Sequence, residues 1–213
     1  MTAEPVPTTT ILLPPRPGLS GARLRLFETA LELFGERGYH AVSVRDIAQA
    51  LGQQPGALYF HVQSKQQLLY EISLIGVEEH RDLVRAALLD AGREPAEQVR
   101  AMTRTHVLAH LDNRSLVRVA SRENAVALDP EQIEVLIRVR DETVQLMTEV
   151  IERGVRLGVF NPMDVHLAVM AIGALGIRAA EWWTPESPHS KEHIADTYAE
   201  FAVRILIEPK AGG

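Results

Sequence analysis

The sequence contains no cysteine among its 213 residues, few aromatic side chains (5%) and no apolar run long enough to cross a bilayer. The missing thiols exclude disulfides, thiolate metal sites and cysteine nucleophiles. The longest strongly apolar stretch, residues 167–177, is far shorter than the roughly 20 residues that a membrane-spanning helix needs. With 46% hydrophobic and 23% charged residues, the chain has the composition of a folded protein that buries its core without covalent cross-links.

Residues 1–18 differ in composition from the rest of the chain. They hold five prolines, three consecutive threonines and a single basic residue, Arg16. A secretory signal needs a charged start and an apolar centre, so none is expected here. The composition instead predicts a disordered arm on a cytoplasmic protein that has no membrane partner.

The net charge of −6 conceals a division along the chain. Residues 16–65 carry six Lys and Arg side chains against four acids, a balance of +2, whereas residues 66–213 carry a balance of −7. Taken alone, this charge division is explained equally well by random surface charge and by a surface that binds nucleic acid. The helix pattern therefore has to decide between them.

The N-terminal part is predicted to contain an amphipathic helix over residues 20–37 and a second helix that begins after Ser43. In the first, four apolar residues recur at spacings of three and four. In the second, Ser43 is a favourable N-cap and Asp46 stands where a capping box needs an acceptor. Gly38 and Gly52 mark the two helix ends. The apolar positions of the first helix are Leu24, Phe27, Leu31 and Phe34, and those of the second are Val44, Ile47, Ala48 and Leu51.

A third short helix is expected from Pro55 to about His61, and a long fourth helix after Ser64. Two short helices joined by a glycine-containing turn, with a third helix bracing them, form a helix-turn-helix whose second helix enters the DNA major groove. Residues 19–65 are therefore predicted to be a DNA-binding domain.

On the third helix, Leu58 and Val62 should face inward and the remaining side chains outward. Gln53 and Gln54 could read adenine, because an amide both donates and accepts hydrogen bonds. Small residues allow close approach to base edges, while hydroxyl, imidazole and basic groups can contact phosphate. The predicted DNA-binding residues are Ser43, Arg45, Gln53, Gln54, Gly56, Ala57, Tyr59, His61 and Lys65.

Less specific roles compete with several of these assignments. Phe60 is better interpreted as a core aromatic than as a contact, and the same interpretation is open for Tyr59. His61 could cap or pack rather than contact phosphate. Arg23, Arg25 and Arg45 could be solvated side chains without a DNA contact.

The stretch from Arg23 to Ile72 resembles the DNA-binding domain of the tetracycline-repressor-type (TetR) regulators. The residues that carry the resemblance are Ala30, Leu33, Phe34, Gly38, Tyr39, Ser43, Val44, Ile47, Ala48, Gly52, Leu58-Tyr59-Phe60-His61 and Ser64-Lys65-Gln66-Gln67-Leu68. The resemblance implies an all-helical homodimer that binds a near-palindromic operator and is released by a small molecule. Gln53, Gln54 and Val62 depart from the family's usual small apolar residue, Ser or Thr cap, and Phe.

Residues 66–213 are helical throughout by pattern and form the predicted ligand-binding and dimerisation domain. A long helix should reach about Asp90. Glycine, asparagine and proline punctuation then predicts helices over residues 95–112, 114–127, 130–157, 162–183 and 190–207. The fold class is thus all-α.

The last two predicted helices look like a dimer surface. The first carries small residues that permit close helix approach, and the second carries an apolar face, so two copies could form a four-helix bundle. The competing interpretation is a core within one chain. The predicted interface residues are Ala171, Ala174, Ile194, Tyr198, Phe201 and Ile205.

The central helices are predicted to enclose a ligand pocket, because polar groups interrupt their apolar faces. Fixed cations there could hold a phosphate or carboxylate, although each cation alone could be a surface charge. The predicted ligand-binding residues are Met102, His106, His110, Arg118, Arg122, Asn124 and Arg140, with Arg138 nearby.

Two features of this domain bear on the identity of the ligand. The run from Glu181 to Pro185, with Trp182 and Trp183, is similar to the C-terminal part of TetR members that sense acyl-CoA thioesters, although a structural role for the indoles is the simpler interpretation. His106 and His110 stand four residues apart as zinc ligands can, and His80 or His166 could complete a site. Without a clear third ligand, no metal and no cofactor are predicted.

Three functions remain open from the sequence. The first is a ligand-responsive transcriptional repressor whose effector is an acyl-CoA or a drug-like apolar compound. The second is a metal-assisted hydrolase built around His106 and His110, which the missing HExxH, GxSxG, P-loop and GxGxxG motifs disfavour. The third is an architectural DNA-binding protein without a ligand, which a body lacking a cavity would favour.

Overall fold

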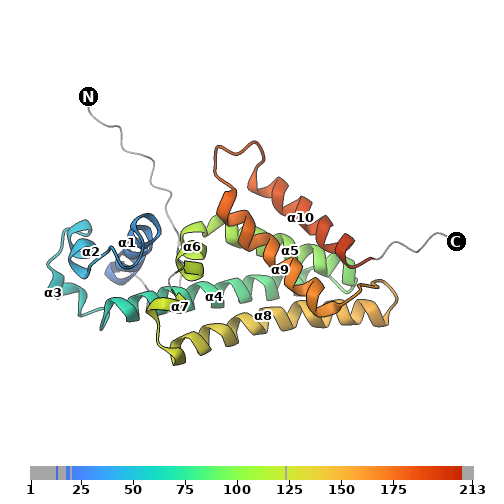
Figure 1. Ribbon diagram of the computed structural model, residues 1–213, viewed down its shortest axis with the longest axis horizontal. Coiled ribbons are helices and arrows are strands. Elements are labelled where there is room, and N and C mark those ends of the chain that lie inside the picture. Colours follow the sequence, from blue (N-terminus) through green and yellow to red (C-terminus); the bar gives the residue numbers. More distant parts are fainter. Residues whose placement is uncertain (1–12, 14–17, 20, 123, 208–213) are drawn as a thin grey trace.

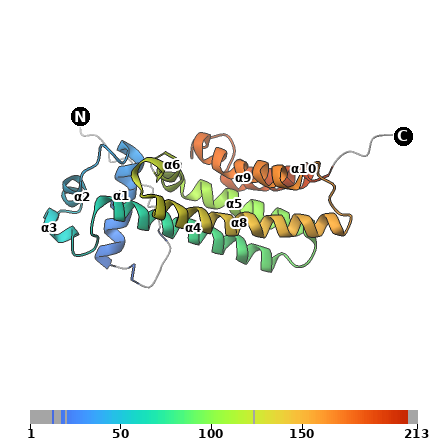
Figure 2. The ribbon, with the colours of Figure 1, turned by 60° about the horizontal axis from the view of Figure 1, so that its bottom comes forward.

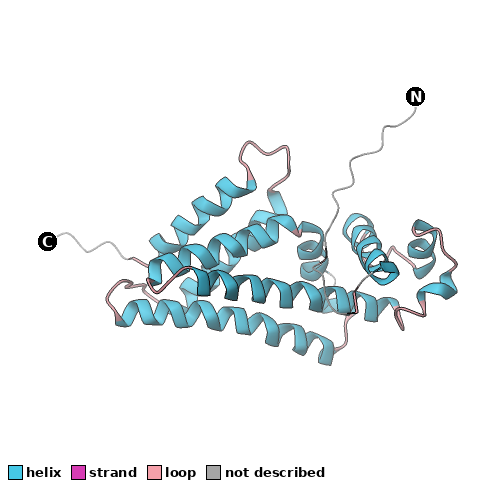
Figure 3. Cartoon of the chain, turned by 180° about the vertical axis from the view of Figure 1, so that it is seen from behind, coloured by secondary structure: helices cyan, strands magenta, loops and turns pink. Residues whose placement is uncertain are grey.

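In the computed structural model the chain forms an all-helical molecule with a small domain at one end of an elongated helical body (Figure 1). The structure describes residue 13 and residues 18–19, 21–122 and 124–207, without the side chains of 121–125. Within these residues no element is a β-strand, and Figure 3 shows only helices joined by loops. The predicted all-α fold class is confirmed.

The small domain consists of α1 (Gly21–Arg37), α2 (Val44–Ala50) and α3 (Pro55–Leu58), followed by the start of the long helix α4 (Lys65–Asp90). The apolar positions predicted for the first two helices are buried or partly buried in one common core. Glycines in the left-handed region of φ end both helices: Gly38 has φ +83° and Gly52 has φ +65°. L-residues avoid this region, so glycine fixes where the chain turns.

The body is built from α4, α5 (Pro95–Asp112), α6 (Arg114–Arg122), α7 (Asn124–Ala127), α8 (Pro130–Arg156), α9 (Val165–Trp182) and α10 (Lys191–Ile205). The two longest helices, α4 and α8, run beside each other along the molecule, and α5 packs against α4, α8, α9 and α10 (Figure 2). Helix α5 is therefore the central element of the body.

The helix boundaries mostly follow the predicted punctuation. Proline stands at the first turn of α3, α5 and α8, where its missing N–H costs no hydrogen bond. Helix α9 begins at Val165 rather than at residue 162, because Asp164 caps it by accepting a hydrogen bond from the amide of Leu167 at 2.8 Å. The predicted segment 114–127 corresponds to α6 and α7, which lie on either side of residue 123.

Helix α6 connects the two parts of the molecule. It packs against α1 of the small domain and also against α4, α5 and α9 of the body. At the α1 contact, a Cβ on Gly35 would lie 3.1 Å from Cβ of Ser115, so the two helices approach closely at this glycine. Helix α6 is therefore in close contact with both the small domain and the body.

Most of the predicted N-terminal arm, residues 1–18, lies outside the described residues. Leu13 is described, and it is buried, with 4% of its surface exposed, in the same core that holds α1 and the start of α4. The prediction of disorder is therefore wrong at this position. Packing of a leucine side chain against a preformed apolar surface offsets the entropy lost in ordering it.

The expectation that no segment is long and apolar enough to cross a membrane is wrong for α9, which meets that criterion by length and composition alone. In this fold its buried side, which includes Ala168, Val169 and Ile172, packs against α5 and α8. The same helix also has large apolar side chains on its outer side, among them Leu167, which is 64% exposed. Part of the apolar character of α9 is thus not used within one chain.

Candidate functional site

The N-terminus of α2 is fixed by its own sequence. The amide of Asp46 donates to Oγ of Ser43 at 3.2 Å, and the amide of Ser43 donates to the Asp46 carboxylate at 2.7 Å. This is the predicted capping box. Hydrogen bonds from the Ser43 hydroxyl and, to a smaller extent, from the Ser43 amide lower the pKa of the Asp46 carboxyl and keep it charged. Ser43 and Arg45 are exposed beside α3, so the cap leaves them on the outer face.

Helix α3 covers only Pro55–Leu58, and turns stabilised by hydrogen bonds of the His61 and Val62 amides to the Leu58 carbonyl continue it toward residue 62. Leu58 and Val62 are buried, as predicted. The predicted readers and contacts are on the opposite side: Gln53, Gln54, Gly56 and Tyr59 are exposed, and Ala57 and His61 are half-exposed. Gln54 is the N-cap residue, but its side chain makes no capping hydrogen bond.

Phe60 does not have the core position that the sequence favoured. Its side chain is 89% exposed, beside Tyr59 at 57%. Leu58 and Val62 are the residues of this segment that are buried in the core, and Phe60 lies on the opposite, solvent side. Two exposed aromatic rings therefore lie at the tip of the small domain, where they can contact DNA sugars and phosphates.

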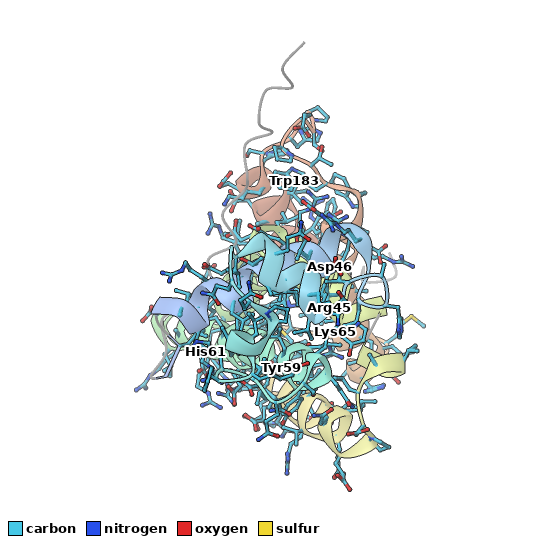
Figure 4. All side chains as sticks on the ribbon, turned by 90° about the vertical axis from the view of Figure 1, so that its left-hand side faces the viewer. Arg45, Asp46, Tyr59, His61, Lys65 and Trp183 are labelled. Carbon is cyan, nitrogen blue, oxygen red and sulfur yellow. The ribbon has the colours of Figure 1, made fainter. Side chains whose placement is uncertain are left out.

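Figure 4 looks onto the end of the molecule that α2 and α3 form. Tyr59, His61 and Arg45 lie on this end, and Trp183 lies on the body, above them in this view. The face thus combines amide, hydroxyl, imidazole and guanidinium groups around a small glycine and alanine surface. Such a surface fits the phosphates and base edges of duplex DNA.

Lys65 has a structural role that the sequence did not reveal. Its Nζ donates to the carbonyls of Tyr39 at 2.9 Å and Val42 at 2.8 Å, and it lies 4.0 Å from the centroid of the Tyr39 ring. Two of the three ammonium N–H groups are thus used to hold the α1–α2 loop against α4. The phosphate contact predicted for Lys65 remains a prediction beside this structural role.

The body contains a cavity of ≈ 440 Å³ between α4, α5, α6, α8 and α9. Its wall is mostly apolar and includes Leu13 of the N-terminal segment, Leu116 and Val117 of α6, and Met147 of α8. The ionisable groups of the wall are His80, His106, His110, Arg140 and Glu79. A mostly apolar cavity with a few convergent polar groups is typical of a small-molecule site.

Four of the seven predicted ligand-binding residues line this cavity: Met102, His106, His110 and Arg140. Arg118 does not. It lines a separate hollow with Phe34 to Gly38 of α1, because the face of α6 that carries Leu116, Val117 and Ala120 is the one that turns toward the cavity. The side chains of Arg122 and Asn124 lie outside the described residues. Thr143 and Asn113, which also line the cavity, were not recognised from the sequence.

The three cavity histidines form a hydrogen-bonded cluster. His80 Nε2 lies 2.9 Å from His106 Nδ1, His106 Nε2 lies 2.9 Å from the Gly173 carbonyl, and His110 Nδ1 lies 2.8 Å from the His106 carbonyl. His166, the other residue proposed to join them, is exposed and lies outside this group. The third member, His80, comes from α4.

The surroundings of the cluster favour neutral imidazoles. Burial, followed by the charges of His110 and Arg140, lowers the pKa of His80 to about 3. Burial likewise lowers the pKa of His106 and His110. Desolvation by neighbouring protein atoms also lowers the pKa of the Arg140 guanidinium, although the residue as a whole is exposed and the group remains charged. The cavity thus offers one fixed cation and three neutral rings.

The cluster makes stability depend on pH in a defined direction. An unfolded histidine titrates near pH 6.5, so below that pH the unfolded chain binds protons that the folded cluster refuses. We expect the free energy of unfolding to be unaffected by the cluster above about pH 7. It should fall as the pH drops from about 6.5 to 5, by up to about 1.4 kcal/mol per pH unit for each histidine. Urea denaturation at several pH values measures this dependence.

Two variants test the assignment to the cluster. In His80→Gln the number of protons taken up on unfolding should fall by about one, so the free energy of unfolding should depend less steeply on pH. The reason is that one histidine that stays neutral in the folded chain has been removed. The exposed His166, changed to glutamine, is the matched control and should leave the dependence unaltered. Equal slopes in both variants would show that the cluster does not cause the effect.

The predicted dimer residues separate into two groups. Ile194 is buried in a cluster with Val107 and Leu111 of α5, so it belongs to the core of one chain. Ala174 lines the cavity but is also exposed. Ala171, Phe201 and Ile205 are exposed, and Tyr198 is half-exposed and stacks on Phe201 with ring centroids 6.0 Å apart. Ile194 is therefore wrong as an interface residue, because α10 packs this side chain against α5.

The two tryptophans also differ. The indole N–H of Trp183 donates to the His189 carbonyl at 2.9 Å, and the guanidinium of Arg114 lies 5.8 Å from its ring. This bond fixes the loop between α9 and α10. Trp182 is 50% exposed on the outer side of α9. The structural interpretation thus holds for Trp183 alone.

Comparisons with known proteins agree with this arrangement. Residues 26–72 match the family "Bacterial regulatory proteins, tetR family", and residues 92–206 match "Tetracyclin repressor-like, C-terminal domain". The chain is 30% identical over 199 residues to the HTH-type transcriptional repressor KstR2 of Rhodococcus jostii, covering 90% of this chain and 94% of that protein.

Solved structures show the same fold. A tetR-family regulatory protein from Rhodococcus RHA1 superposes with a TM-score of 0.83 at 33% identity, over 88% of this chain and 98% of that one. AibR in complex with isovaleryl coenzyme A and operator DNA superposes with a TM-score of 0.74 at 24% identity, over 83% of this chain and 95% of that one. The relatives are regulators and not enzymes, and the chain belongs to the tetR family of transcriptional repressors.

Proposed function

We propose that the protein is a repressor that binds a near-palindromic operator as a homodimer and is released by a small molecule, an acyl-CoA thioester or a related lipid-catabolism intermediate. The observation that carries this proposal is the position of α6. Leu116, Val117 and Ala120 on α6 line the cavity, and Ser115 packs on Gly35 of α1. A molecule in the cavity therefore presses on the helix that braces the DNA-binding domain.

In the proposed operator complex, α3 lies in the major groove. Gln53 and Gln54 read base edges, while Gly56 and Ala57 allow close approach. Ser43, Arg45, Tyr59 and His61 contact phosphates and fix the register. The cavity argues against an architectural DNA-binding protein without a ligand, since such a protein has no need of a hollow body.

The proposed dimer pairs α9 and α10 of one chain with those of a second copy. Large apolar side chains are exposed on α9, including Leu167 at 64% and Ile177 at 41%, and on α10, including Phe201 at 43% and Ile205 at 40%. Exposed apolar surface of this extent is typical of an interface. Ala171, on the outer side of α9, permits close approach of the partner helix.

The thioester assignment rests on the chemistry of the cavity wall. The apolar side chains suit an acyl group, and Arg140 supplies a cation for a phosphate or carboxylate. Arg140 has no ion pair within the described chain. AibR, which has the same fold, was solved with isovaleryl coenzyme A. The apolar wall also favours a second candidate, an uncharged drug-like compound, which would not need Arg140.

The mechanism is thermodynamic coupling. An effector that binds better to a body conformation in which the two heads are wrongly spaced weakens operator binding, by about 1–3 kcal/mol in typical allosteric proteins. The change arises only if the effector distinguishes the two conformations. Displacement of α6 by ligand volume in the cavity provides that distinction.

Titration of a labelled operator complex tests the proposal. We expect one or more CoA thioesters, from a panel with short branched, long-chain and steroid-derived acyl groups, to release the DNA with at least about a tenfold loss of affinity. Free acids and free CoA serve as comparisons. Light scattering should give a mass near twice the 23.6 kDa of the chain.

Arg140→Gln should weaken the response to thioesters by about tenfold or more, because a charge-assisted hydrogen bond is lost. Arg138→Gln is the matched control, since Arg138 is exposed on the same helix and does not line the cavity. Release by uncharged compounds alone, unaffected by Arg140→Gln, would favour the drug-like candidate. No release by any compound would contradict an effector function.

A further inference from the structure

We propose that His80, His106 and His110 form a three-histidine site for a borderline divalent cation, Zn²⁺ in the first place, with a fourth coordination position open to the cavity. One ligand nitrogen from each ring lies within 4.8 Å of the other two. The three rings come from two helices, α4 and α5, and all of them line the cavity. Three histidines and one open position are the arrangement of many accessible zinc sites.

The hydrogen bonds to carbonyls fix which ring nitrogen of His106 and of His110 carries a lone pair. A carbonyl can only accept, so the bond to Gly173 places a proton on His106 Nε2 and leaves a lone pair on His106 Nδ1. In the same way, the bond to the His106 carbonyl places a proton on His110 Nδ1 and leaves a lone pair on Nε2. Carbonyl partners of this kind fix the tautomer and ring orientation of metal-bound histidines.

The contact between His80 and His106 has the dimensions of two ligands on one metal. Their facing nitrogens, Nε2 and Nδ1, lie 2.9 Å apart. Nitrogens bound tetrahedrally to zinc at about 2.0–2.1 Å are separated by roughly 3.3 Å. Before metal binds, neutral His80 carries its single proton on Nε2 and donates it to His106 Nδ1. Metal binding requires the other neutral tautomer of His80, in which the proton is exchanged through solvent from Nε2 to Nδ1 and Nε2 offers its lone pair. The remaining nitrogen has to move inward by at most about 1.5 Å, which ring rotation supplies.

The chain makes room for this cluster at a glycine. A Cβ on Gly176 would lie 2.5 Å from Cδ2 and 2.6 Å from Nε2 of His106, so any side chain at this position would displace the imidazole. At Gly173, one turn earlier on the same helix, a Cβ would meet nothing within 4 Å. The missing side chain at Gly176 therefore leaves the space that the His106 ring occupies, although Gly176 supplies no ligand atom.

The protonation state and the neighbouring charge define the kind of occupant. The lowered pKa values leave all three rings neutral, as metal ligands must be. Neutral imidazoles suit Zn²⁺, Co²⁺ and Ni²⁺ and disfavour Mg²⁺ and Ca²⁺. Arg140, whose charge acts on His80 and His110, opposes a bare cation and favours an anionic fourth ligand such as hydroxide, chloride or a carboxylate.

Titration of the purified protein with Co²⁺ tests the site without DNA or effector. A surface pair, His189 and His193, whose rings lie 5.0 Å apart, could bind metal independently. The titration therefore uses the His189→Gln/His193→Gln protein as its reference. We expect one Co²⁺ per chain with the visible absorption of four-coordinate cobalt, displaced by one equivalent of Zn²⁺. Calorimetry with Zn²⁺ gives the same stoichiometry.

Variants then assign the ligands. His106→Gln and His110→Gln should each weaken Co²⁺ binding by at least about 100-fold, and Gly176→Ala, which keeps all three imidazoles, by about 10–100-fold. Gly173→Ala should bind like the reference protein. Arg140→Gln should tighten binding several-fold, because it removes a nearby positive charge. Circular dichroism shows whether each variant is folded.

Failure of the reference protein to bind one Co²⁺ would overturn the proposal, and so would unchanged binding in the folded His110→Gln protein. A folded Gly176→Ala protein that binds Co²⁺ as tightly as Gly173→Ala would remove the positioning role of Gly176. None of these results depends on operator binding or on release by a thioester. A protein without a metal site would therefore still be able to act as the proposed repressor.

Discussion

Replacing Gly56 with glutamate is expected to abolish operator binding, with a loss of affinity of at least about 100-fold. Gly56 is exposed on α3, and a Cβ at this position would meet nothing within 4 Å. The new carboxylate would face the phosphates and block the close approach that the glycine allows, and like charges across an interface cost several kcal/mol. Fluorescence anisotropy with operator DNA at moderate ionic strength measures the effect.

The fold should tolerate this substitution. An acidic residue in the first turn of a helix is favoured by the helix dipole, so the thermal midpoint should remain close to that of the native protein. Gly56→Ala separates the steric effect from the charge and should lose far less affinity. Leu89→Glu adds the same charge at the far end of α4, where the side chain is 75% exposed, and should bind DNA normally. Native affinity in Gly56→Glu would mean that α3 does not face the duplex.

Filling the cavity is expected to produce a repressor that cannot be released. Gly173→Phe places an aromatic ring from α9 into open space in the cavity of ≈ 440 Å³. The effector then has to compete with this ring, and we expect the concentration for half-release to rise by more than about tenfold, about 1.4 kcal/mol. Operator affinity without effector should stay within a few-fold, because one aromatic ring fills only part of the cavity and is expected to leave α6 in place.

Gly173→Ala is the matched variant for this experiment. Its methyl group leaves most of the cavity free, and alanine is favoured over glycine within a helix by about 0.5–1 kcal/mol. It should therefore remain releasable and be slightly more stable. Light scattering of both variants excludes a change of oligomeric state as the cause. Release of Gly173→Phe at native effector concentrations would show that the effector binds elsewhere.

The local features of the fold were predictable because they are set by neighbouring residues. Ser43 and Asp46 are three positions apart and form their capping box whatever the rest of the chain does. Prolines at the first turns of α5 and α8 likewise mark helix starts from sequence alone. Leu58 and Val62, four residues apart, had to share one side of α3.

The features that were missed depend on contacts between distant residues. The amine of Lys65 finds the carbonyls of Tyr39 and Val42, 26 and 23 residues away, and no local pattern announces this. Phe60 is exposed because it lies on the side of its segment opposite the buried side chains. The prediction that Arg118 lines the cavity failed because the apolar residues of α6, spaced three to four apart, allowed either face of the helix to turn inward.

The histidine cluster lies between these two cases. Helices α4 and α5 are joined by a short loop at Gly92, so the pair forms a hairpin in which positions about equally far from the turn lie opposite each other. His80 and His106 are nearly such a pair. This spacing could have identified His80 as the third member, although the orientation of the rings required the Gly173 carbonyl on α9.

Leu13 gives the cavity wall a component that belongs to the beginning of the chain. Deleting the first twenty residues to improve crystallisation is therefore expected to remove part of the cavity wall. A small fluorophore attached near Leu13 would therefore report directly whether a ligand occupies the cavity.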